Sequence, residues 1–585
     1  MKIKLLYPNL SGPDYGAELL KARGVTDVEK FKHPNESCLQ DWNALDNIMK
    51  GVTLMKACQT ESAKVGIIVD CDVDGFTSGA ILYQYLLRFN PFLNIVYYIH
   101  SGKAHGLEEH WQEIADEHFD LLFIPDAGSN DSQYAKEINC PIIVLDHHIL
   151  EDEEVAPNMI IINNQTSPNY HNKSLSGAGV VYQFCRALDA NYRYHCAPDY
   201  IDLAALGICG DMMSGLEAEN QYFWHEGFSH IQNYFLLSLA RKQSYSITGK
   251  MNATDKDIIE ALNPISVAFY IVPLINAMIR VGTMEEKTRM FEAFIDGHKM
   301  IPSKKRGANG ALEEIAVESA RECGNARTHQ NKFRDEAVAQ LEQKIFKHDL
   351  LENRILFVRL DDTEQYPSEL NGLLANQLAQ KYHHPTIIAR LNDEGYIRGS
   401  ARGLSNTELT SFKDYLNSTG LFEYTAGHDN AFGISIKNND LTRLHELANE
   451  DLKSYDFGDS YYEVEFSRPA LSNDIEDIIT NLDGYKNTWG QNNDQPMIYV
   501  SGLHFTKKDV QIMGKNANTI KIVKNGVTYI KFFANELIDA INSFETDQLR
   551  LDIVGKPNLN VWGSYITPQI FIEQYELHED SILDF

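Results

Sequence analysis

The sequence predicts an α/β protein of several domains, with a parallel-sheet domain first and a strand-rich domain last. Apolar, β-branched runs alternate with helix-like segments over 61–300 and again over 351–455, as strands buried on both faces of a parallel sheet require. Short strand patterns separated by turn signals fill 456–585, which is typical of a small barrel or sandwich. A chain of 585 residues is also too long for a single core.

Helical sequence precedes and joins these parts. Residues 1–60 carry amphipathic spacing that predicts an N-terminal segment of short helices, and 301–350 reads as a helical linker between the two α/β domains. The linker has one apolar stripe at helical spacing, formed by Phe333, Ala337, Val338, Leu341 and Ile345.

Composition narrows the function classes. A formal net charge of -30 argues against nucleic-acid binding by the whole surface, although salt limits the field of distant charges to about 8 to 10 Å, so a local basic groove stays compatible with it. Eight scattered cysteines without a C-x-x-C pair indicate neither a disulfide framework nor a zinc site. The N-terminus lacks a signal core and no run of 18 apolar residues stands out, so we expect a soluble cytoplasmic protein without a membrane partner.

The stretch "VDCDVDGFTSGA", residues 69–80, places Asp70, Asp72 and Asp74 at alternate positions before a glycine. It begins like an EF-hand calcium loop, but the twelfth position is Ile81 instead of a bidentate Glu, and a strand-like run precedes it where an EF-hand has a helix. We therefore favour a carboxylate cluster at the C-terminal end of a buried strand, where ligand sites of open α/β sheets lie.

Further acids and histidines follow other strands of the same domain. Asp126 follows "FIP", Asp146, His147 and His148 stand in "VLDHH", and Asp211 follows another apolar stretch. Each alone has a structural explanation, such as a helix cap or a buried histidine. Together they predict bound cations, because clustered buried carboxylates are costly without positive charge. Carboxylate and imidazole ligands suit Mn²⁺ or Mg²⁺, and two such ions about 3.5 to 4 Å apart promote hydrolysis of a phosphate ester.

Four segments, "DCDVDG", "PDAGS", "LDHH" and "GDMM", occur in this order and resemble the signature motifs of the DHH phosphoesterase superfamily. The resemblance implies that two Mn²⁺ or Mg²⁺ ions are held by Asp72, Asp74, Asp126, His147 and Asp211. It also implies that His148 faces the metals and the phosphate, while Asp146 orients the histidines. Ile68 departs from the pattern, because several members carry a histidine there.

The second α/β domain contains "GSARG" and "AGHDNAFG", which resemble the paired motifs of the DHHA1 substrate-binding domain. The resemblance implies that Arg402 and His428, with Ser400 beside them, contact the phosphates of a nucleic acid. A guanidinium that grips phosphate oxygens in two places suits that role. The alternative is that the residues of both segments only serve to form turns. Ala426 departs from the family, which usually has a glycine there.

Three further segments resemble RecJ-like single-stranded-DNA-specific exonucleases in particular. They are the N-terminal "LLKARGVTDVEKFKHP", "LINAMIRVG" with Asn276 and Arg280, and "LDGYKNTWGQNNDQP" before the strand-rich domain. Leu274 stands where an Arg is usual. The C-terminal tail resembles the end of the RecJ OB-type barrel, so the resemblance covers nearly the whole chain, in order.

Three residues are weaker candidates for substrate contact. Gly177 lies in "SGAGVVYQF", a small-residue loop entering a helix whose free amides could bind phosphate, or else a tight packing turn. Lys103 and His105 belong to a polar loop at the predicted catalytic edge.

The last domain concentrates positive charge in an otherwise acidic chain. Between 501 and 533 there are six lysines against one acid, Asp509. Phe505, Tyr529, Phe532 and Phe533 are interleaved with them, as in a groove that stacks the bases of a single strand. The alternative is that the lysines lie on solvated strand edges and the aromatic residues belong to the core. We expect one of the two adjacent phenylalanines to be buried, because neighbouring strand residues face opposite ways.

The function favoured is a RecJ-like, metal-dependent 5′ to 3′ exonuclease that acts on single-stranded DNA, releases mononucleotides and serves DNA repair, recombination or replication. A single-strand-binding protein or a helicase is a candidate partner. One alternative is a DHH phosphodiesterase for short RNA or small nucleotides, against which the chain length and the barrel argue. The other is a non-catalytic, Cdc45-like scaffold, against which the intact ligand set argues.

Overall fold

In the computed structural model the chain forms two compact units. Unit I comprises 27–331 and 487–494, and unit II comprises 1–26, 332–486 and 495–585. The residues described are 1–10, 12–59, 63–102, 104–151, 154–361, 370–405, 407–458, 461–562 and 565–580.

The N-terminal segment is not purely helical, and it is divided between the two units. Residues 2–5 form a strand, β1 (Lys2–Leu5), which pairs in parallel with β14 (Tyr461–Val464) of unit II. Short helices follow as expected: α1 (Tyr15–Ala22), α2 (Val28–Lys32), η1 (Glu36–Cys38), η2 (Trp42–Ala44), α3 (Ile48–Leu54) and η3 (Met55–Gln59). The prediction of one helical segment over 1–60 was wrong at its start, because a partner strand far along the chain decides the conformation of β1.

Unit I contains the predicted parallel sheet. Its five strands are β2 (Lys64–Val69), β3 (Asn94–Ile99), β4 (Leu121–Pro125), β5 (Ile142–Asp146) and β6 (Met159–Asn163). Their order is β3-β2-β4-β5-β6 and every pair is parallel.

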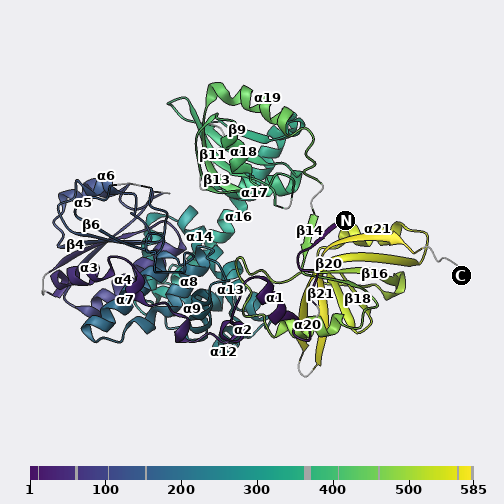
Figure 1. The fold of residues 1–585 in the computed structure, drawn as a ribbon, viewed down its shortest axis with the longest axis horizontal. Helices are drawn as coiled ribbons and strands as arrows, with labels where there is room; N and C mark the ends of the chain where they lie inside the picture. The colour runs from purple at the N-terminus through teal and green to yellow at the C-terminus, as the bar shows by residue number, and fades with distance from the viewer. Residues whose placement is uncertain are drawn as a thin grey trace. The chain divides into compact units, whose positions relative to one another are not determined.

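Both faces of this sheet are covered (Figure 1). One face packs Val65, Ile67 and Phe123 against α4 (Val73–Phe89) and α7 (Gly177–Tyr192). The other face packs Ile68 and Ile124 near α5 (Trp111–Asp116) and α6 (Ser132–Ala135). A sheet covered on both sides explains why its strands are near-continuous apolar runs.

The rest of unit I is mainly helical. Its elements are α8 (Ile201–Gly210), α9 (Ala218–Ser229), α10 (Tyr234–Lys242), α11 (Ser244–Thr248), α12 (Asp255–Ala261), α13 (Pro264–Ser266), η5 (Val267–Ile271), α14 (Val272–Val281), α15 (Met284–Ile295), β7 (Met300–Pro302) and β8 (Leu312–Glu314). One described stretch, 264–281, is long and apolar enough by composition to cross a membrane. Its residues Val267, Ile271, Ile275 and Met278 are buried in the main core of unit I.

The long helix α16 (Ile315–Lys347) occupies the predicted linker. After η6 (Leu350–Glu352), unit II forms a five-stranded sheet of order β12-β13-β11-β10-β9, in which only the β10–β9 pair is parallel. The elements are β9 (Leu356–Leu360), α17 (Asn371–Tyr382), β10 (Thr386–Leu391), β11 (Tyr396–Arg402), α18 (Phe412–Ser418), β12 (Phe422–His428), β13 (Ala431–Lys437), η8 (Asn438–Asp440) and α19 (Leu441–Asp451). This is the predicted second α/β domain.

The strand-rich end of the chain forms a seven-stranded sheet of order β15-β16-β20-β21-β19-β18-β17. Its elements are β15 (Phe466–Pro469), α20 (Ile475–Asp483), β16 (Ile498–Thr506), η9 (Lys507–Asp509), β17 (Gln511–Met513), β18 (Thr519–Lys524), β19 (Val527–Lys531), α21 (Asn535–Ser543), β20 (Gln548–Trp562) and β21 (Tyr565–Glu579).

The aromatic residues of this sheet differ from the expectation in one respect. Phe505 and Tyr529 are buried and belong to the core. Phe532 and Phe533 are both exposed, by 51% and 86%, so the prediction that one of them is buried was wrong. The reason is that β19 ends at Lys531 and Phe533 adopts a φ of 53°, so the alternation of a strand does not apply to the pair.

Candidate metal centre

The acidic and histidine residues meet at the C-terminal edge of the sheet in unit I. Strand β2 leads into Asp70, Asp72 and Asp74, β4 leads into Asp126, and β5 ends at Asp146. Since β2, β4 and β5 are neighbours and parallel, their ends lie side by side. Asp211 reaches the same edge from the C-terminal end of α8.

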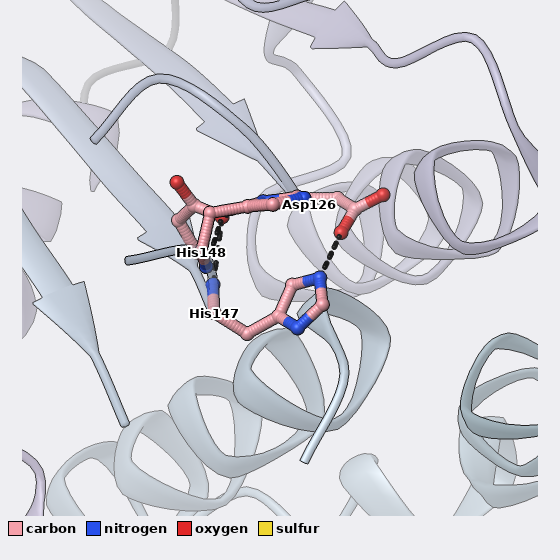
Figure 2. Close-up of side chains that lie close together, drawn as sticks. Asp126, His147 and His148 are labelled. Carbon is pink, nitrogen blue, oxygen red and sulfur yellow. Dashed lines mark hydrogen bonds and ion pairs between the residues drawn. The ribbon is translucent and has the colours of Figure 1, made fainter. Parts of the chain in front are cut away.

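His147 lies at the centre of this cluster. Its Nε2 atom is 3.2 Å from Oδ1 of Asp126, 3.5 Å from Oδ2 of Asp211 and 3.9 Å from Oδ2 of Asp74. Figure 2 shows the imidazole of His147 pointing at the Asp126 carboxylate. Asp126 is held in the left-handed region at a φ of 67°. We call these four residues the His147 cluster.

The carboxylate of Asp74 is fixed by the N-terminus of α7. Its Oδ1 accepts from Ser176 Oγ at 2.8 Å and from the Ala178 amide at 3.0 Å, while Oδ2 accepts from the Gly177 amide at 2.6 Å. Free amides and the helix dipole stabilise a negative charge at this point. The Gly177 amide, expected to meet a substrate phosphate, therefore already has a protein carboxylate as its partner.

Two glycines allow the carboxylates to approach this closely. A Cβ atom on Gly177 would lie 2.3 Å from Oδ1 of Asp126, and a Cβ on Gly207 of α8 would lie 2.3 Å from Oδ1 of Asp74. Both distances are far below a van der Waals contact, so neither position has room for a side chain.

The electrostatics of the cluster call for positive charge. Burial, with the charges of Asp74 and Asp72, raises the pKa of Asp126 well above its ordinary value. The same causes raise the pKa of Asp211 to about 8. Burial lowers the pKa of His147, so its ring is neutral and can act as a ligand. Asp126 Oδ1 and His147 Nε2 are buried without a hydrogen-bond partner among the described residues. Three carboxylates and a neutral imidazole with unused donor atoms suit Mn²⁺ or Mg²⁺.

Asp146 organises the histidine pair from behind. Its Oδ1 accepts from the amides of His147 and His148 and, at 2.8 Å, from Nδ1 of the His148 ring, while Oδ2 accepts from the Ser129 amide. The Asp146 carboxylate raises the pKa of His148 to about 9, so this half-exposed ring carries a positive charge at neutral pH. Asp146 thus contacts the His148 ring and the backbone amides of both histidines, and its orienting role in the reaction stays a prediction.

Asp72 lies in the first of the four motifs, and Ile68 lies just before it. Asp72 caps α4, because its Oδ1 accepts from the Gly75 amide at 2.9 Å. Burial and the charges of Asp70 and Asp74 raise its pKa to about 6, and its charge in turn acts on Asp126 and Asp211. Ile68 is buried in the core on the other face of the sheet and, as an aliphatic side chain, supplies no ligand atom.

Arg280 lies in the last turn of α14, near enough to Asp72 for the two charges to interact. Burial and the charge of Arg327 lower its pKa. Within the described residues no hydrogen bond or ion pair holds Arg280, which leaves the guanidinium for an anion. Asn276 lies one helical turn earlier, half-buried, and Leu274 is buried in the core.

The polar loop after β3 is described except for Lys103, which lies outside the described residues. His105 is 62% exposed and its Nδ1 lies 2.7 Å from Oδ2 of Asp70. The loop is thus tied to the end of β2.

A second polar site lies in unit II. Arg402, at the end of β11, and His428, at the end of β12, line one cavity of about 510 Å³ together with Asn376, Gln380 and Lys413. Gly372 of α17 makes room for the arginine, since a Cβ there would lie 2.5 Å from Nη2 of Arg402. The structure therefore brings the two predicted phosphate contacts together.

Ser400 lies two residues before Arg402 on β11 and is not among the described residues that line this cavity. Ala426 occupies an ordinary, exposed position on β12, paired with Gly433. The next residue, Gly427, has a φ of 128° and would clash with Ala431 if it carried a Cβ. Strand β12 thus accommodates an alanine at position 426, whereas position 427 requires glycine.

Several residues that build these sites were missed by sequence reasoning: Ser176, Gly207, Arg327 and Gly372. Glycines inside apolar helical sequence, as in "ALGICG" and "LNGLLAN", are a signal of close approach that could have identified two of them. Ser176 opens the segment "SGAGVVYQF" and is a typical N-cap residue, so its place before α7 had a local signal. Its contact with Asp74 and the effect of Arg327 on Arg280 had none, because the partners come from other elements.

Comparison with known proteins agrees with this architecture. The sequence matches the DHH family, N-terminal domain, over residues 64–208 and the RecJ OB domain over residues 475–574. It is 34% identical over 585 residues to a Bacillus subtilis (strain 168) protein named "Putative SPbeta prophage-derived single-strand DNA-specific exonuclease YorK", covering 99% of this chain and 98% of that one. It is 24% identical to the single-stranded-DNA-specific exonuclease RecJ of the same organism, covering all of this chain and 70% of the relative.

The fold agrees as well. The structure of RecJ in complex with Mn²⁺ from Thermus thermophilus superimposes with a TM-score of 0.70 at 17% identity, covering 95% of this chain and 75% of the other. The same protein in complex with Mg²⁺ gives a TM-score of 0.64. With the carboxylate and imidazole cluster at the sheet edge, the two domain matches and a relative aligned over nearly its whole length, the chain belongs to the RecJ-like single-strand DNA-specific exonucleases of the DHH family.

Proposed function

We propose that this protein hydrolyses the phosphodiester bonds of single-stranded DNA at the His147 cluster. The strand is degraded from its 5′ end into mononucleotides, with two Mn²⁺ or Mg²⁺ ions as cofactors. Asp72, Asp74, Asp126, His147 and Asp211 form the ligand set of these ions.

One observation carries the proposal. Oδ1 of Asp126 and Nε2 of His147 lie 3.2 Å apart in the interior, each without a hydrogen-bond partner among the described residues, and two further carboxylates surround them. Buried ligand atoms of this kind are costly to the fold unless a proton or a cation satisfies them, and a cation can satisfy all of them at once. Bound divalent ions would supply charge stabilisation for a phosphodiester under attack.

The protein's own groups have separate tasks. Ser176 Oγ and the α7 amides fix the position of the Asp74 carboxylate, so the ligand geometry is set before substrate arrives. His148, protonated through its contact with Asp146, presents a positive charge beside the cluster. Arg280 adds a second cation without a protein partner among the described residues. The positive charges of His148 and Arg280 suit the negative charge that develops on phosphate oxygens during hydrolysis.

Substrate selection is assigned to unit II. Arg402, His428 and Lys413 give one cavity three basic side chains suited to phosphate oxygens. The exposed Phe532 and Phe533, close in sequence to Lys521 and Lys531, offer stacking and charge to a single strand without sequence preference. The relatives named above as single-strand DNA-specific exonucleases support this substrate class.

The proposed setting is the cytoplasm, in DNA repair, recombination or replication. A single-strand-binding protein or a helicase is the proposed partner, because either one presents the single strand that the nuclease consumes. The acidic surface of the chain, with its net charge of -30, suits a protein partner.

The test is degradation of a single strand labelled in parallel at its 5′ and 3′ ends, with Mn²⁺ or with chelator. The proteins compared are wild type, Asp126→Ala and the matched control Asp120→Ala. Asp120 accepts a hydrogen bond from the Lys64 amide and does not belong to the His147 cluster. We expect the 5′ label to appear as mononucleotide only with metal and only in wild type and the control.

Two other results would each replace the proposal. Survival of long strands with hydrolysis of dinucleotides would make the protein a phosphodiesterase of short RNA or small nucleotides. Absence of any metal-dependent hydrolysis would make it a scaffold.

A further inference from the structure

Three different kinds of ligand meet beside the His147 cluster. They are the carboxylate of Asp70, the thiol of Cys71 and the imidazole of His105, and one donor atom of each lies within 4.8 Å of the other two. Asp70 and Cys71 follow β2 directly, and His105 comes from the loop between β3 and α5. None of them belongs to the ligand set assigned above.

We propose that Asp70 Oδ2, Cys71 Sγ and His105 Nδ1 form a third cation site, which prefers a borderline-soft ion such as Zn²⁺ to Mn²⁺ or Mg²⁺. Sulfur and imidazole ligands favour zinc, whereas the carboxylate-rich His147 cluster favours harder ions. Three protein ligands leave a fourth tetrahedral position for water. This site is independent of the nuclease function proposed above.

The distances suit a tetrahedral ion after a small movement. Cys71 Sγ lies 3.8 Å from His105 Nδ1. Zinc bonds of about 2.3 Å to sulfur and about 2.0 Å to nitrogen place those two atoms about 3.5 Å apart. The hydrogen bond between His105 Nδ1 and Asp70 Oδ2 is 2.7 Å and must open to about 3.4 Å for the same reason. His105 is exposed on a loop, so its side chain can make that movement.

His100 is a second, independent indication of positive charge at Asp70. Its side chain is completely buried, and its Nδ1 lies 3.3 Å from Oε2 of Glu109. A neutral imidazole has one N–H, and in the tautomer that donates it from Nδ1 to the nearer carboxylate of Glu109, Nε2 is a bare acceptor. That Nε2 lies 3.8 Å from Oδ1 of Asp70 and has no hydrogen-bond partner among the described residues. A cation at Asp70 relieves this contact between two acceptors.

A neighbouring group, His100, Glu109 and His110, is a poorer candidate. The His100 and His110 rings stack with their centroids 5.1 Å apart and an interplanar angle of 27°. An imidazole binds a metal in the plane of its ring, and one ion cannot lie in two planes that are stacked in this way. The donor atoms around Asp70 have no such conflict.

Occupation of the site would tie the loop after β3 to the junction of β2 and α4. That loop carries His105, a predicted substrate contact, and the junction carries Asp72. A soft cation would thus hold substrate-facing and metal-binding segments in one arrangement, without taking part in the chemistry.

The test uses Co²⁺ as a spectroscopic substitute for Zn²⁺, in the presence of excess Mg²⁺. We expect a near-ultraviolet sulfur-to-cobalt charge-transfer band that saturates at one Co²⁺ per chain and disappears when Zn²⁺ is added. Cys71→Ser should abolish the band and weaken Zn²⁺ binding at least about tenfold, since loss of an outer partner alone costs that much. Cys196→Ser, which changes the other partly exposed cysteine, should leave both unchanged.

Absence of the band in wild type, or its survival in Cys71→Ser, would overturn the proposal. Unchanged Zn²⁺ affinity in His105→Gln, with circular dichroism showing an intact fold, would also overturn it. Asp126→Ala should keep the band while it loses metal-dependent DNA hydrolysis. The spectroscopic result and the nuclease result can therefore fail separately.

Discussion

Oδ1 of Asp126 and Nε2 of His147 face one another across 3.2 Å in the interior of unit I, and neither atom has a hydrogen-bond partner among the described residues. They come from the ends of adjacent strands, β4 and β5. Without a cation, this buried pair destabilises the folded state. A cation bound beside the two atoms stabilises it.

Asp126→Asn should therefore have opposite effects with and without metal. In chelator we expect a larger free energy of unfolding than wild type, because burial and the charge of Asp74 make an ionised Asp126 unfavourable. Asn also tolerates the left-handed backbone at this position. Mn²⁺ at a hundredfold excess over its Kd should stabilise wild type by about 2.7 kcal/mol and the variant much less. Urea unfolding measures both, and equal stabilisation by Mn²⁺ would contradict the assignment.

Gly177→Ala and Gly207→Ala should each damage the metal centre. The new methyl group would lie 2.3 Å from a carboxylate oxygen of Asp126 or Asp74, so the ligand must move. We expect calorimetry to show Mn²⁺ affinity at least about tenfold lower, because disturbing the groups that position metal ligands has effects of that size. Gly102→Ala is the control, since a Cβ there meets nothing within 4 Å. Normal affinity in both cluster variants would show that the site has more room than the structure indicates.

Arg402→Lys should raise KM for single-stranded DNA with a smaller effect on kcat, because an ammonium cannot grip two phosphate oxygens at once. Gly372→Ala should act in the same direction by displacing the Arg402 guanidinium. Steady-state kinetics on strands of fixed length measure both. Arg398→Lys is the matched control: it lies earlier on the same strand, β11, is 55% exposed, and does not line the cavity. A uniform loss of kcat in Arg402→Lys would instead point to a role in the chemical step.

Asp131→Asn should change how stability depends on pH. Burial raises the pKa of Asp131 to about 6, above its ordinary 3.8, although the Leu107 amide donates to it at 2.7 Å. Between these values the folded state binds more protons than the unfolded state, so wild-type stability falls as pH rises through this window. We expect the variant to match wild type near pH 4 and to be more stable by about 1 kcal/mol above pH 6, since partial exposure weakens the effect. Denaturant titrations at several pH values would reveal it, and a gap that widens toward acid would have the wrong sign.

Phe533→Ala should weaken the binding of a single strand by about 1 to 3 kcal/mol if the exposed ring stacks on a base. The ring is 86% exposed and unlike a core residue, so the loss should appear without a loss of stability. Fluorescence anisotropy with catalytically inactive Asp126→Ala as background avoids degradation of the probe. Phe92→Ala, which removes an aromatic ring of unit I that is 67% exposed, should leave affinity unchanged.

Much of the fold and part of the site could be read from the sequence. Unbroken β-branched runs predicted strands buried on both faces, and five of them form the parallel sheet of unit I. Because parallel strands end at one edge, the acids after β2 and β4 and the histidines after β5 could be expected to meet, and they do. Local periodicity and strand polarity are properties of short segments, so they are accessible without coordinates.

Tertiary structure decided what depends on distant partners. The Asp74 carboxylate is held by α7, about one hundred residues later in the chain, and β1 becomes a strand because β14 pairs with it. The exposure of both Phe532 and Phe533 follows from where β19 ends, and the meeting of Cys71 with His105 follows from the path of a loop. The sequence by itself determined the strands of the parallel sheet in unit I, their polarity and the chemistry at their ends. Only tertiary structure decided which donors face which acceptors, because hydrogen bonds and charge pairs between elements depend on side-chain positions that no local pattern encodes.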